Sequence, residues 1–222
     1  SMVEQQHIVN TIGSVDDLIE NYDCQITKLI TLGDALLQRY KSKENLSKYA
    51  NILLGGTPSR KHEEYWNGSI KWINSGAITG QSCVFDQTEF ITKLGVEKSA
   101  AKRAVTGDTV LSIIDPSINK VSLILDDNIY FNQSVICINP KNKLNCGYLY
   151  FATRELVNRI KGFATGAAQQ SLNKEMFEIS DIVCPDVEGQ NLLNIYGLQI
   201  MNLYRKKINL QKQKKLLLDK YF

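Results

Sequence analysis

The strongest constraint on this chain is a pair of long apolar stripes, one near each end of its 222 residues. In residues 4–44, which contain no proline and only two glycines, apolar residues recur at alternating spacings of four and three. The stripe consists of Ile8, Ile12, Val15, Ile19, Tyr22, Ile26, Leu29, Leu36 and Tyr40, with one interruption at Gly33. This spacing predicts a helix about 60 Å long whose narrow apolar seam needs a second helix to cover it.

Residues 188–222 carry the second stripe. It is formed by Leu193, Tyr196, Ile200, Leu203, Leu210, Leu217 and Tyr221, with Lys207 and Lys214 at two seam positions. These two lysines weaken the stripe, although their stems can lie along an apolar groove while their ammonium groups reach water. Residues 1–45 hold seven acidic and four basic residues, whereas residues 188–222 hold two acidic and seven basic ones. Because opposite charge favours pairing, we expect the two stripes to form an antiparallel coiled coil.

The two terminal segments also resemble each other. Ile8-Val9 and Ile12-Gly13 match Leu192-Leu193 and Tyr196-Gly197 at an offset of 184. Residues 36–40 match residues 217–221 at an offset of 181, so the second copy is about three residues shorter. An internal repeat on either side of a domain predicts a pseudo-symmetric architecture.

Residues 46–187 have a different character. Short β-rich runs at 69–73, 83–85, 109–114, 121–125 and 134–138 are separated by turn signals such as Asn67-Gly68 and Asp115-Pro116. One stretch, residues 147–161, has a helical apolar pattern. The sequence therefore predicts an α+β fold in which a globular domain with a curved mixed sheet (46–187) lies between two long helices (1–45 and 188–222).

Several classes of function find no support in the residues. The five cysteines form no C-x-x-C pair, and His7 and His62 have no second ligand at metal spacing, so we expect reduced thiols, no metal site and a cytoplasmic protein. No apolar run has the length of a membrane span. Neither a phosphate loop nor a nucleophile or metalloprotease motif is present, so we expect no catalysis in this chain.

A dense polar stretch opens the middle domain and is typical of a nucleic-acid surface. Hydroxyls and bases bind phosphate, whereas amides and arginines read base edges. The candidate DNA-binding residues here are Thr57, Ser59, Arg60, Lys61, Tyr65, Lys71, Asn74 and Ser75. For Arg60 and Lys61 the alternative is a plain solvated loop. Trp66 and Trp72 are expected to anchor the core rather than to stack on bases.

A second polar stretch, residues 165–175, lies near the end of the same domain. Its candidate DNA-binding residues are Gln169, Gln170, Ser171, Asn173 and Lys174, among which the amides can read adenine. The alternative is that Ser171 or Asn173 caps a short helix.

Together these stretches carry a resemblance to a known family. L-x-G-G-T-P-S (53–59) followed by Y-W-x-G-x-I-x-W-I-x-S-G (65–76) resembles the start of a target recognition domain of type I restriction-modification specificity subunits. G-A-A-Q-Q-S-L-N (166–173) with the following I-S-D-I-V-C-P (179–185) resembles its end. E-Q-Q-H-I-V (4–9) resembles the opening of the family's spacer helix.

The resemblance implies a role and a set of partners. In the family, two recognition domains alternate with two spacer helices, and each domain reads one half of a split site in double-stranded DNA. The helices set the gap and dock methyltransferase (modification) subunits, and restriction subunits join the full complex. The expected cofactors, S-adenosylmethionine, ATP and Mg, belong to those partners and not to this chain. Partner binding is assigned to seam residues Ile8, Ile12, Ile19, Leu29, Leu36, Leu203, Leu210 and Leu217.

The order helix, domain, helix departs from that pattern, because only one recognition domain is present. We therefore expect a half-length specificity subunit or a fragment of one, and the helices also allow a homodimer. The competing interpretation is a coiled-coil protein-interaction adaptor with an α+β head and no DNA binding. Retention on heparin and a salt-dependent shift of duplex DNA would separate the two.

Overall fold

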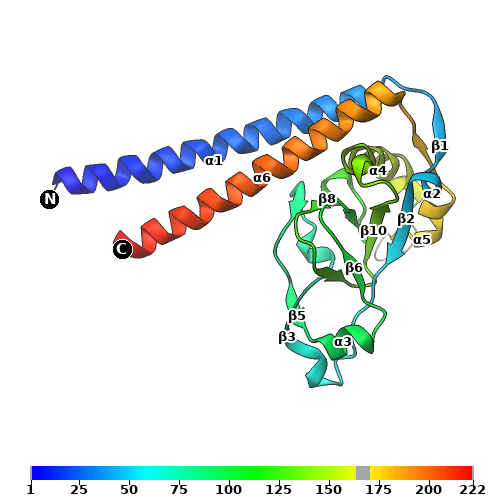
Figure 1. The fold of residues 1–222 in the computed structure, drawn as a ribbon, viewed down its shortest axis with the longest axis horizontal. Coiled ribbons are helices and arrows are strands. Elements are labelled where there is room, and N and C mark those ends of the chain that lie inside the picture. Colours follow the sequence, from blue (N-terminus) through cyan, green and yellow to red (C-terminus); the bar gives the residue numbers. More distant parts are fainter. Residues whose placement is uncertain (1, 164–170, 222) are drawn as a thin grey trace.

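The computed structural model describes residues 2–163 and 171–221 and has the shape of a head on a long arm (Figure 1). The arm consists of α1 (Met2–Leu37) and α6 (Val187–Tyr221), which run antiparallel so that both chain ends lie at its far end (Figure 1). The head is formed by the residues between them. The predicted α+β domain between two long antiparallel helices is therefore confirmed.

Charge and apolar packing both hold the arm together. Lys207 and Lys214 donate to Asp23 and Asp16 of α1, each with a closest N···O distance of 2.6 Å. The lysines that interrupt the apolar seam thus form cross-helix ion pairs. The seam residues Ile12, Ile19, Leu29, Leu36, Leu203, Leu210 and Leu217 are half-buried, whereas the side chain of Ile8 lies outside the described part.

The first helix ends at Leu37 and not at residue 45. Beyond it, the chain enters the head through β1 (Lys43–Asn45), which pairs antiparallel with β11 (Asp181–Val183), the strand by which the chain leaves. The Asn45 side chain accepts from Ser47 N and so caps the short α2 (Leu46–Tyr49). The heptad pattern therefore overestimates the length of α1, because residues 43–45 pair with β11 and do not continue the helix.

The strands of the described head fall into two larger sheets besides the β1–β11 pair. The first has the order β2-β10-β7-β8-β4. Its members are β2 (Ala50–Leu54), β10 (Val135–Pro140), β7 (Thr109–Ser112), β8 (Val121–Ile124) and β4 (Cys83–Val84). All its pairs are antiparallel except β4–β8. The helix α4 (Cys146–Ile160) covers this sheet and contributes much of the main core.

The second sheet has the order β5-β3-β9-β6 and extends away from the arm (Figure 1). It contains β5 (Glu89–Ile91), β3 (Trp66–Ile73), β9 (Ile129–Phe131) and β6 (Lys102–Ala104), and its β3–β9 pair is parallel. The short α3 (Lys93–Glu97) lies at the far end of the head, and α5 (Lys174–Glu178) packs on α2 and β2. Two single-turn helices, Glu63–Tyr65 and Ser75–Ala77, flank β3.

Close helix packing seats the head on the arm. A Cβ on Gly33 of α1 would lie 2.2 Å from the Phe151 ring of α4, and one on Gly197 of α6 would lie 2.3 Å from Gly147 Cα. Because no side chain fits at Gly33 or Gly197, α4 approaches both arm helices closely. Gly33, which interrupts the apolar stripe of α1, is therefore the position at which the head packs on α1.

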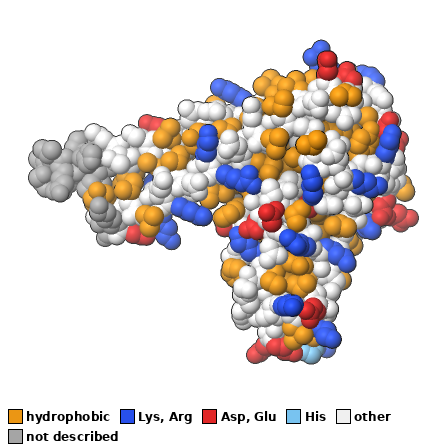
Figure 2. Space-filling view, in the orientation of Figure 1, with side chains coloured by type: hydrophobic (Ala, Val, Ile, Leu, Met, Phe, Trp, Pro, Cys, Tyr) orange, Lys and Arg blue, Asp and Glu red, His pale blue; other side chains and the backbone are white. Residues whose placement is uncertain are grey.

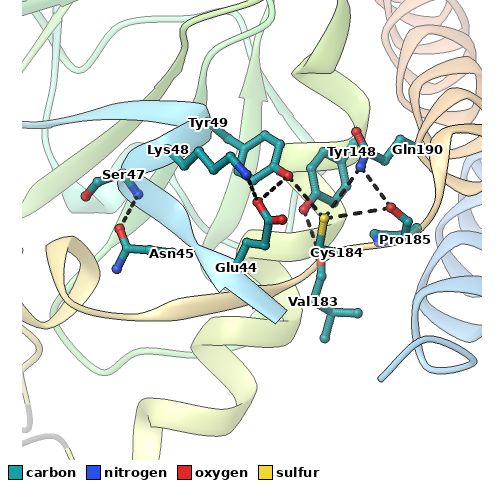
Figure 3. A network of polar contacts seen from close by, with 10 residues as sticks. All are labelled: Glu44, Asn45, Ser47, Lys48, Tyr49, Tyr148, Val183, Cys184, Pro185 and Gln190. Carbon is teal, nitrogen blue, oxygen red and sulfur yellow. Dashed lines mark hydrogen bonds and ion pairs between the residues drawn. The ribbon is translucent and has the colours of Figure 1, made fainter. Parts of the chain in front are cut away.

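A polar network fixes the two connections between head and arm (Figure 3). The Tyr49 hydroxyl donates to Glu44 Oε2 at 2.8 Å and lies 3.1 Å from Cys184 Sγ. The Tyr148 hydroxyl donates to Val183 O at 2.9 Å, and Gln190 of α6 donates to Pro185 O at 2.9 Å (Figure 3). Hydrogen bonds from Lys48 and Tyr49 lower the pKa of Glu44. Side chains of α2, α4 and α6 thus hold the entering and leaving segments together.

Candidate nucleic-acid interface

The two tryptophans of β3 hold the polar loop that follows β2. Trp72 Nε1 donates to Gly56 O and Trp66 Nε1 donates to Ser59 O, each at 3.3 Å. Both rings are buried and meet edge to face with centroids 5.3 Å apart. A Cβ at Gly55 would lie 2.1 Å from Phe131 O, so the loop lies tightly against the sheet. The expectation that the tryptophans anchor the core is confirmed.

Arg60 projects from this loop with its guanidinium 3.5 Å above the centre of the Trp66 ring. Its two terminal nitrogens donate to the carboxylate of Glu89 in β5 at 2.7 and 2.5 Å. These hydrogen bonds lower the pKa of Glu89 and raise that of Arg60. The ring and the carboxylate therefore orient a guanidinium that is still half exposed, as a base- or phosphate-reading arginine requires.

The other candidates in this loop lie around Arg60. Thr57 Oγ1 donates to Gln133 at 2.6 Å, and Ser59 Oγ accepts from Lys61 N at 3.3 Å. The Lys61 side chain is exposed. The Tyr65 ring stacks on His62 with centroids 4.7 Å apart. The loop thus presents hydroxyls, two basic side chains and a stacked aromatic pair on one rigid support.

The remaining candidates of the first stretch lie at the other end of β3. Lys71 is half-buried and donates to Asp126 Oδ2 at 2.9 Å and to Phe85 O at 3.0 Å. Burial raises the pKa of Asp126, but the hydrogen bonds from Lys71 and from Asn128 N, together with the charge of Lys71, outweigh it and the net shift is downward. The Asn74 side chain accepts from Gly76 N at 2.8 Å, and Ser75 is half-buried beside it. In this conformation Lys71 and Asn74 make contacts within the head.

Asn74 also lines a crevice of about 590 Å³ between the head and α6. Its walls carry further amides and hydroxyls that the sequence did not single out. These are Gln81, Gln87 and Gln211, together with Thr79 and Thr88. Tyr204 of α6 donates a hydrogen bond to Gln81 across it. These residues come from a loop and from α6 without a recognisable motif, so only the folded chain brings them together.

The second polar stretch is described in part. Gln169 and Gln170 lie outside the described residues. Ser171 forms an isolated bridge with Ile114, and Lys174 pairs with Glu178 at 2.9 Å. Asn173 caps α5, with its Oδ1 accepting from Met176 N at 2.9 Å. The capping alternative for Asn173 is therefore confirmed, while a DNA contact by these residues stays a prediction.

The two stretches lie on different parts of the head. The loop at 57–65 lies near α3 at the end farthest from the arm, whereas α5 lies beside α2 and β2, nearer the arm (Figure 1). Basic side chains are spread over the visible face of head and arm, with acidic ones among them (Figure 2). An interface that used both stretches would extend along the head and would not be a single basic patch.

The described residues contain no group of three histidines, cysteines or acids that could hold a metal ion. Within the same residues, no helix is both long and apolar enough to cross a membrane.

The comparisons of this chain with known proteins agree on one family. The family model described as "Type I restriction modification DNA specificity domain" matches residues 45–218. The HindI specificity subunit of Haemophilus influenzae is 22% identical over 74% of this chain and 35% of its own length. The EcoR124I/EcoR124II specificity subunit of Escherichia coli is 26% identical over 61% of this chain and 35% of its own length. The chain thus spans about a third of these relatives.

Solved structures give the same fold. The HsdS subunit from Thermoanaerobacter tengcongensis superimposes with a TM-score of 0.54 at 17% identity, over 98% of this chain and 57% of that one. The S subunit from M. genitalium gives a TM-score of 0.56 at 16% identity, over 97% and 57%.

Proposed function

Because the chain belongs to the family of type I restriction modification DNA specificity domains, we propose that it recognises one half of a bipartite site in double-stranded DNA on behalf of a methyltransferase subunit. The chain itself acts without catalysis, and chemistry on the DNA belongs to the partners. S-adenosylmethionine, ATP and Mg are accordingly cofactors of the partner subunits. The adaptor alternative is not favoured, because the family match spans the head and most of α6.

The observation that most supports this function is the geometry of the loop around Arg60. The Arg60 guanidinium stacks on Trp66 and donates two hydrogen bonds to Glu89, so the side chain has few accessible rotamers. Little conformational entropy is therefore lost when Arg60 binds DNA. Lys61 beside it is exposed and suits a phosphate contact. We assign base or phosphate contact first to these two residues, and we assign the crevice amides to the side of the site nearer the arm.

We assign methyltransferase docking to the outer face of the arm. The sequence assigned it to the seam, but the seam residues are half-buried where the two helices pair. A groove on that face is lined by Gln25, Lys28, Gln199 and Asn202, together with the seam residues Leu29 and Leu203. Leu32, Ile195 and Leu198 lie on the same helix faces one or two turns along and are 54, 49 and 54% exposed. Apolar side chains grouped at such a groove suit a helix or loop of a partner protein.

A direct test is methylation mapping. The chain, combined with its cognate methyltransferase and restriction subunits, is incubated with a random-sequence duplex library, and methylated adenines are located. Methylation at one defined half-site sequence supports the proposal, and methylation without a motif contradicts it. Arg60→Ala with Lys61→Ala should weaken duplex binding and flatten its salt dependence. Unchanged affinity and salt slope in that double variant would contradict the assignment of this loop to the DNA interface.

A further inference from the structure

The Arg60–Glu89 pair differs in exposure from the other arginine–carboxylate ion pairs of the described residues. The Arg60 side chain is 57% exposed, whereas those of Arg154 and Arg159 are 8% and 34% exposed. The guanidiniums of Arg154 and Arg159 also donate to backbone carbonyls of the head. Arg60 and Glu89 therefore form the pair whose edge is most accessible to a second molecule.

This pair keeps hydrogen-bonding groups for a further partner. A guanidinium has five N–H donors, and Arg60 gives one from each terminal nitrogen to Glu89. Nε–H and the second hydrogen on each terminal nitrogen are not used by this carboxylate. Each Glu89 oxygen accepts one of the two hydrogen bonds and has a further lone pair. The edge of the pair thus presents two adjacent donors, Nε and a terminal nitrogen, followed by a carboxylate acceptor.

The charges around the pair favour a neutral partner over a phosphate. The loop at 57–65 carries Arg60 and Lys61 but also Glu63 and Glu64, and with Glu89 the acids outnumber Lys and Arg by three to two. Figure 2 shows acidic side chains beside basic ones at this end of the head. A surface that binds the DNA backbone is predominantly basic. The Glu89 carboxylate would repel a phosphate placed on Arg60, whereas a base edge carries no net charge.

The order donor, donor, acceptor matches one kind of base pair in the major groove. A G·C pair presents there the acceptors N7 and O6 of guanine and then the amino donor N4 of cytosine. An arginine on guanine N7 and O6 and a carboxylate on cytosine N4 are both established contacts in protein–DNA complexes. An A·T pair presents N7, the amino group N6 and O4 in the same order. A donor would then face the guanidinium and an acceptor would face the carboxylate.

We propose that Arg60 and Glu89 together read a G·C base pair, with Arg60 donating to guanine N7 and O6 and Glu89 accepting from cytosine N4. This assignment rests on the proposed function and adds to it one base pair of the half-site. Stacking on Trp66 holds the guanidinium in place before DNA arrives. Glu89 determines specificity as well as supporting Arg60, so loss of its carboxylate changes which sequences bind. Lys61 keeps the role of a phosphate contact.

Methylation mapping of single variants tests the pair. The unaltered chain, Arg60→Ala, Glu89→Gln and Lys61→Ala are each combined with the cognate methyltransferase subunit and a random-sequence duplex library. Arg60→Ala should lower the preference for G·C over A·T about tenfold at one position of the half-site and leave the other positions unchanged. Glu89→Gln should lower it at the same position, because an amide can also donate to O4 of thymine. Lys61→Ala is the matched control and should weaken all sequences alike.

Base analogues at that position test the atoms involved. 7-Deazaguanine lacks the N7 acceptor and should weaken duplex binding by the unaltered chain about tenfold. Arg60→Ala should bind 7-deazaguanine and guanine alike. Inosine keeps N7 and O6 and lacks only the minor-groove amino group, so it should bind like guanine. Fluorescence anisotropy measures each affinity.

Three results would overturn the assignment while leaving the proposed function intact. They are a defined half-site whose G·C preferences all survive Arg60→Ala, loss of the same preference in Lys61→Ala, and equal binding of 7-deazaguanine and guanine by the unaltered chain. Methylation by the unaltered chain without any defined sequence would contradict the proposed function, and the assignment of a base pair would fall with it.

Discussion

Asp34 of α1 and Arg154 of α4 form a two-point ion pair, with N···O distances of 3.1 and 2.7 Å. The guanidinium also donates to Ile118 O at 2.9 Å, and its side chain is 8% exposed. An arginine buried so deeply needs a partner for its charge, and the arm supplies it. The pair therefore fixes how the head is oriented relative to the arm, which under the proposed function sets where the half-site lies along the arm.

Asp34→Ala should destabilise the chain by about 2 kcal/mol, because it leaves the buried guanidinium of Arg154 without its counter-ion. The measurement is urea unfolding followed by circular dichroism. Glu20→Ala, which removes an exposed acid from the same helix, is the matched control and should change stability by less than about 0.5 kcal/mol. Equal loss in both variants would mean that the ion pair contributes nothing beyond helix charge.

Gly197→Ala and Gly13→Ala are the same substitution at repeat-equivalent positions and should have opposite effects. A Cβ at Gly197 would lie 2.3 Å from Gly147 Cα, so the helices must separate at a cost of about 2 kcal/mol or more. At Gly13 the Cβ is unobstructed, and better helix propensity should stabilise the chain by about 0.5–1 kcal/mol. Thermal unfolding of the two variants measures both effects, and destabilisation by both would contradict the open surroundings of Gly13.

Glu89→Gln should increase the salt dependence of DNA binding by about one phosphate equivalent, because it frees the charge of Arg60. Fluorescence anisotropy with duplex DNA across a sodium chloride series measures the slope. Glu63→Gln, an exposed acid in the adjoining 3-10 turn, alters net charge equally without touching Arg60 and is the control. Identical salt slopes in Glu89→Gln and Glu63→Gln would show that the change in net charge, and not the release of Arg60, alters the salt dependence of DNA binding.

The same pair gives a pH dependence with a defined sign. Hydrogen bonds from Arg60 lower the pKa of Glu89 below its ordinary value of 4.5. The pair's small contribution to stability is therefore present above 4.5 and is lost as pH falls through the lowered folded-state pKa. In that acidic window the salt slope of the unaltered chain should approach that of Glu89→Gln. A slope difference that persists below the folded-state pKa of Glu89 would argue against titration of this carboxyl.

The arm could be predicted from the sequence because the spacing of apolar residues that specifies each helix is periodic and local. The apolar spacing and the opposite charges of the two segments indicated the pairing. The two seam lysines were expected to weaken it and to reach water, whereas they form the ion pairs Lys207–Asp23 and Lys214–Asp16. The end of α1 was overestimated because β1 pairs with β11, about 140 residues away in the chain, and no local signal announces such a pairing.

The candidate site was predictable only as a set of residue types. The sequence indicated Arg60 but not Glu89, which lies 29 residues later and has no motif of its own. Lys71 was expected as a DNA contact on composition, yet Asp126 faces it only because β3 and β9 are parallel neighbours. Whether a basic side chain is exposed or paired depends on tertiary contacts, which periodicity and composition do not encode.

Leu32→Ser with Leu198→Ser should weaken methyltransferase binding and leave the fold intact. The ion pairs Lys207–Asp23 and Lys214–Asp16 set the helix register and place residue 32 level with residue 198, so the two leucines form one exposed apolar patch. Losing both side chains from the centre of an interface should cost roughly tenfold or more in affinity. Isothermal titration with the methyltransferase subunit measures it.

Leu216→Ser is the control for this double variant, since Leu216 is an equally apolar, 69% exposed leucine toward the far end of α6. It should bind the methyltransferase like the unaltered chain. The free energy of unfolding of the double variant should stay within about 1 kcal/mol of the original, because both leucines already face water. Full affinity in the double variant, or equal loss in Leu216→Ser, would place the methyltransferase elsewhere on the arm.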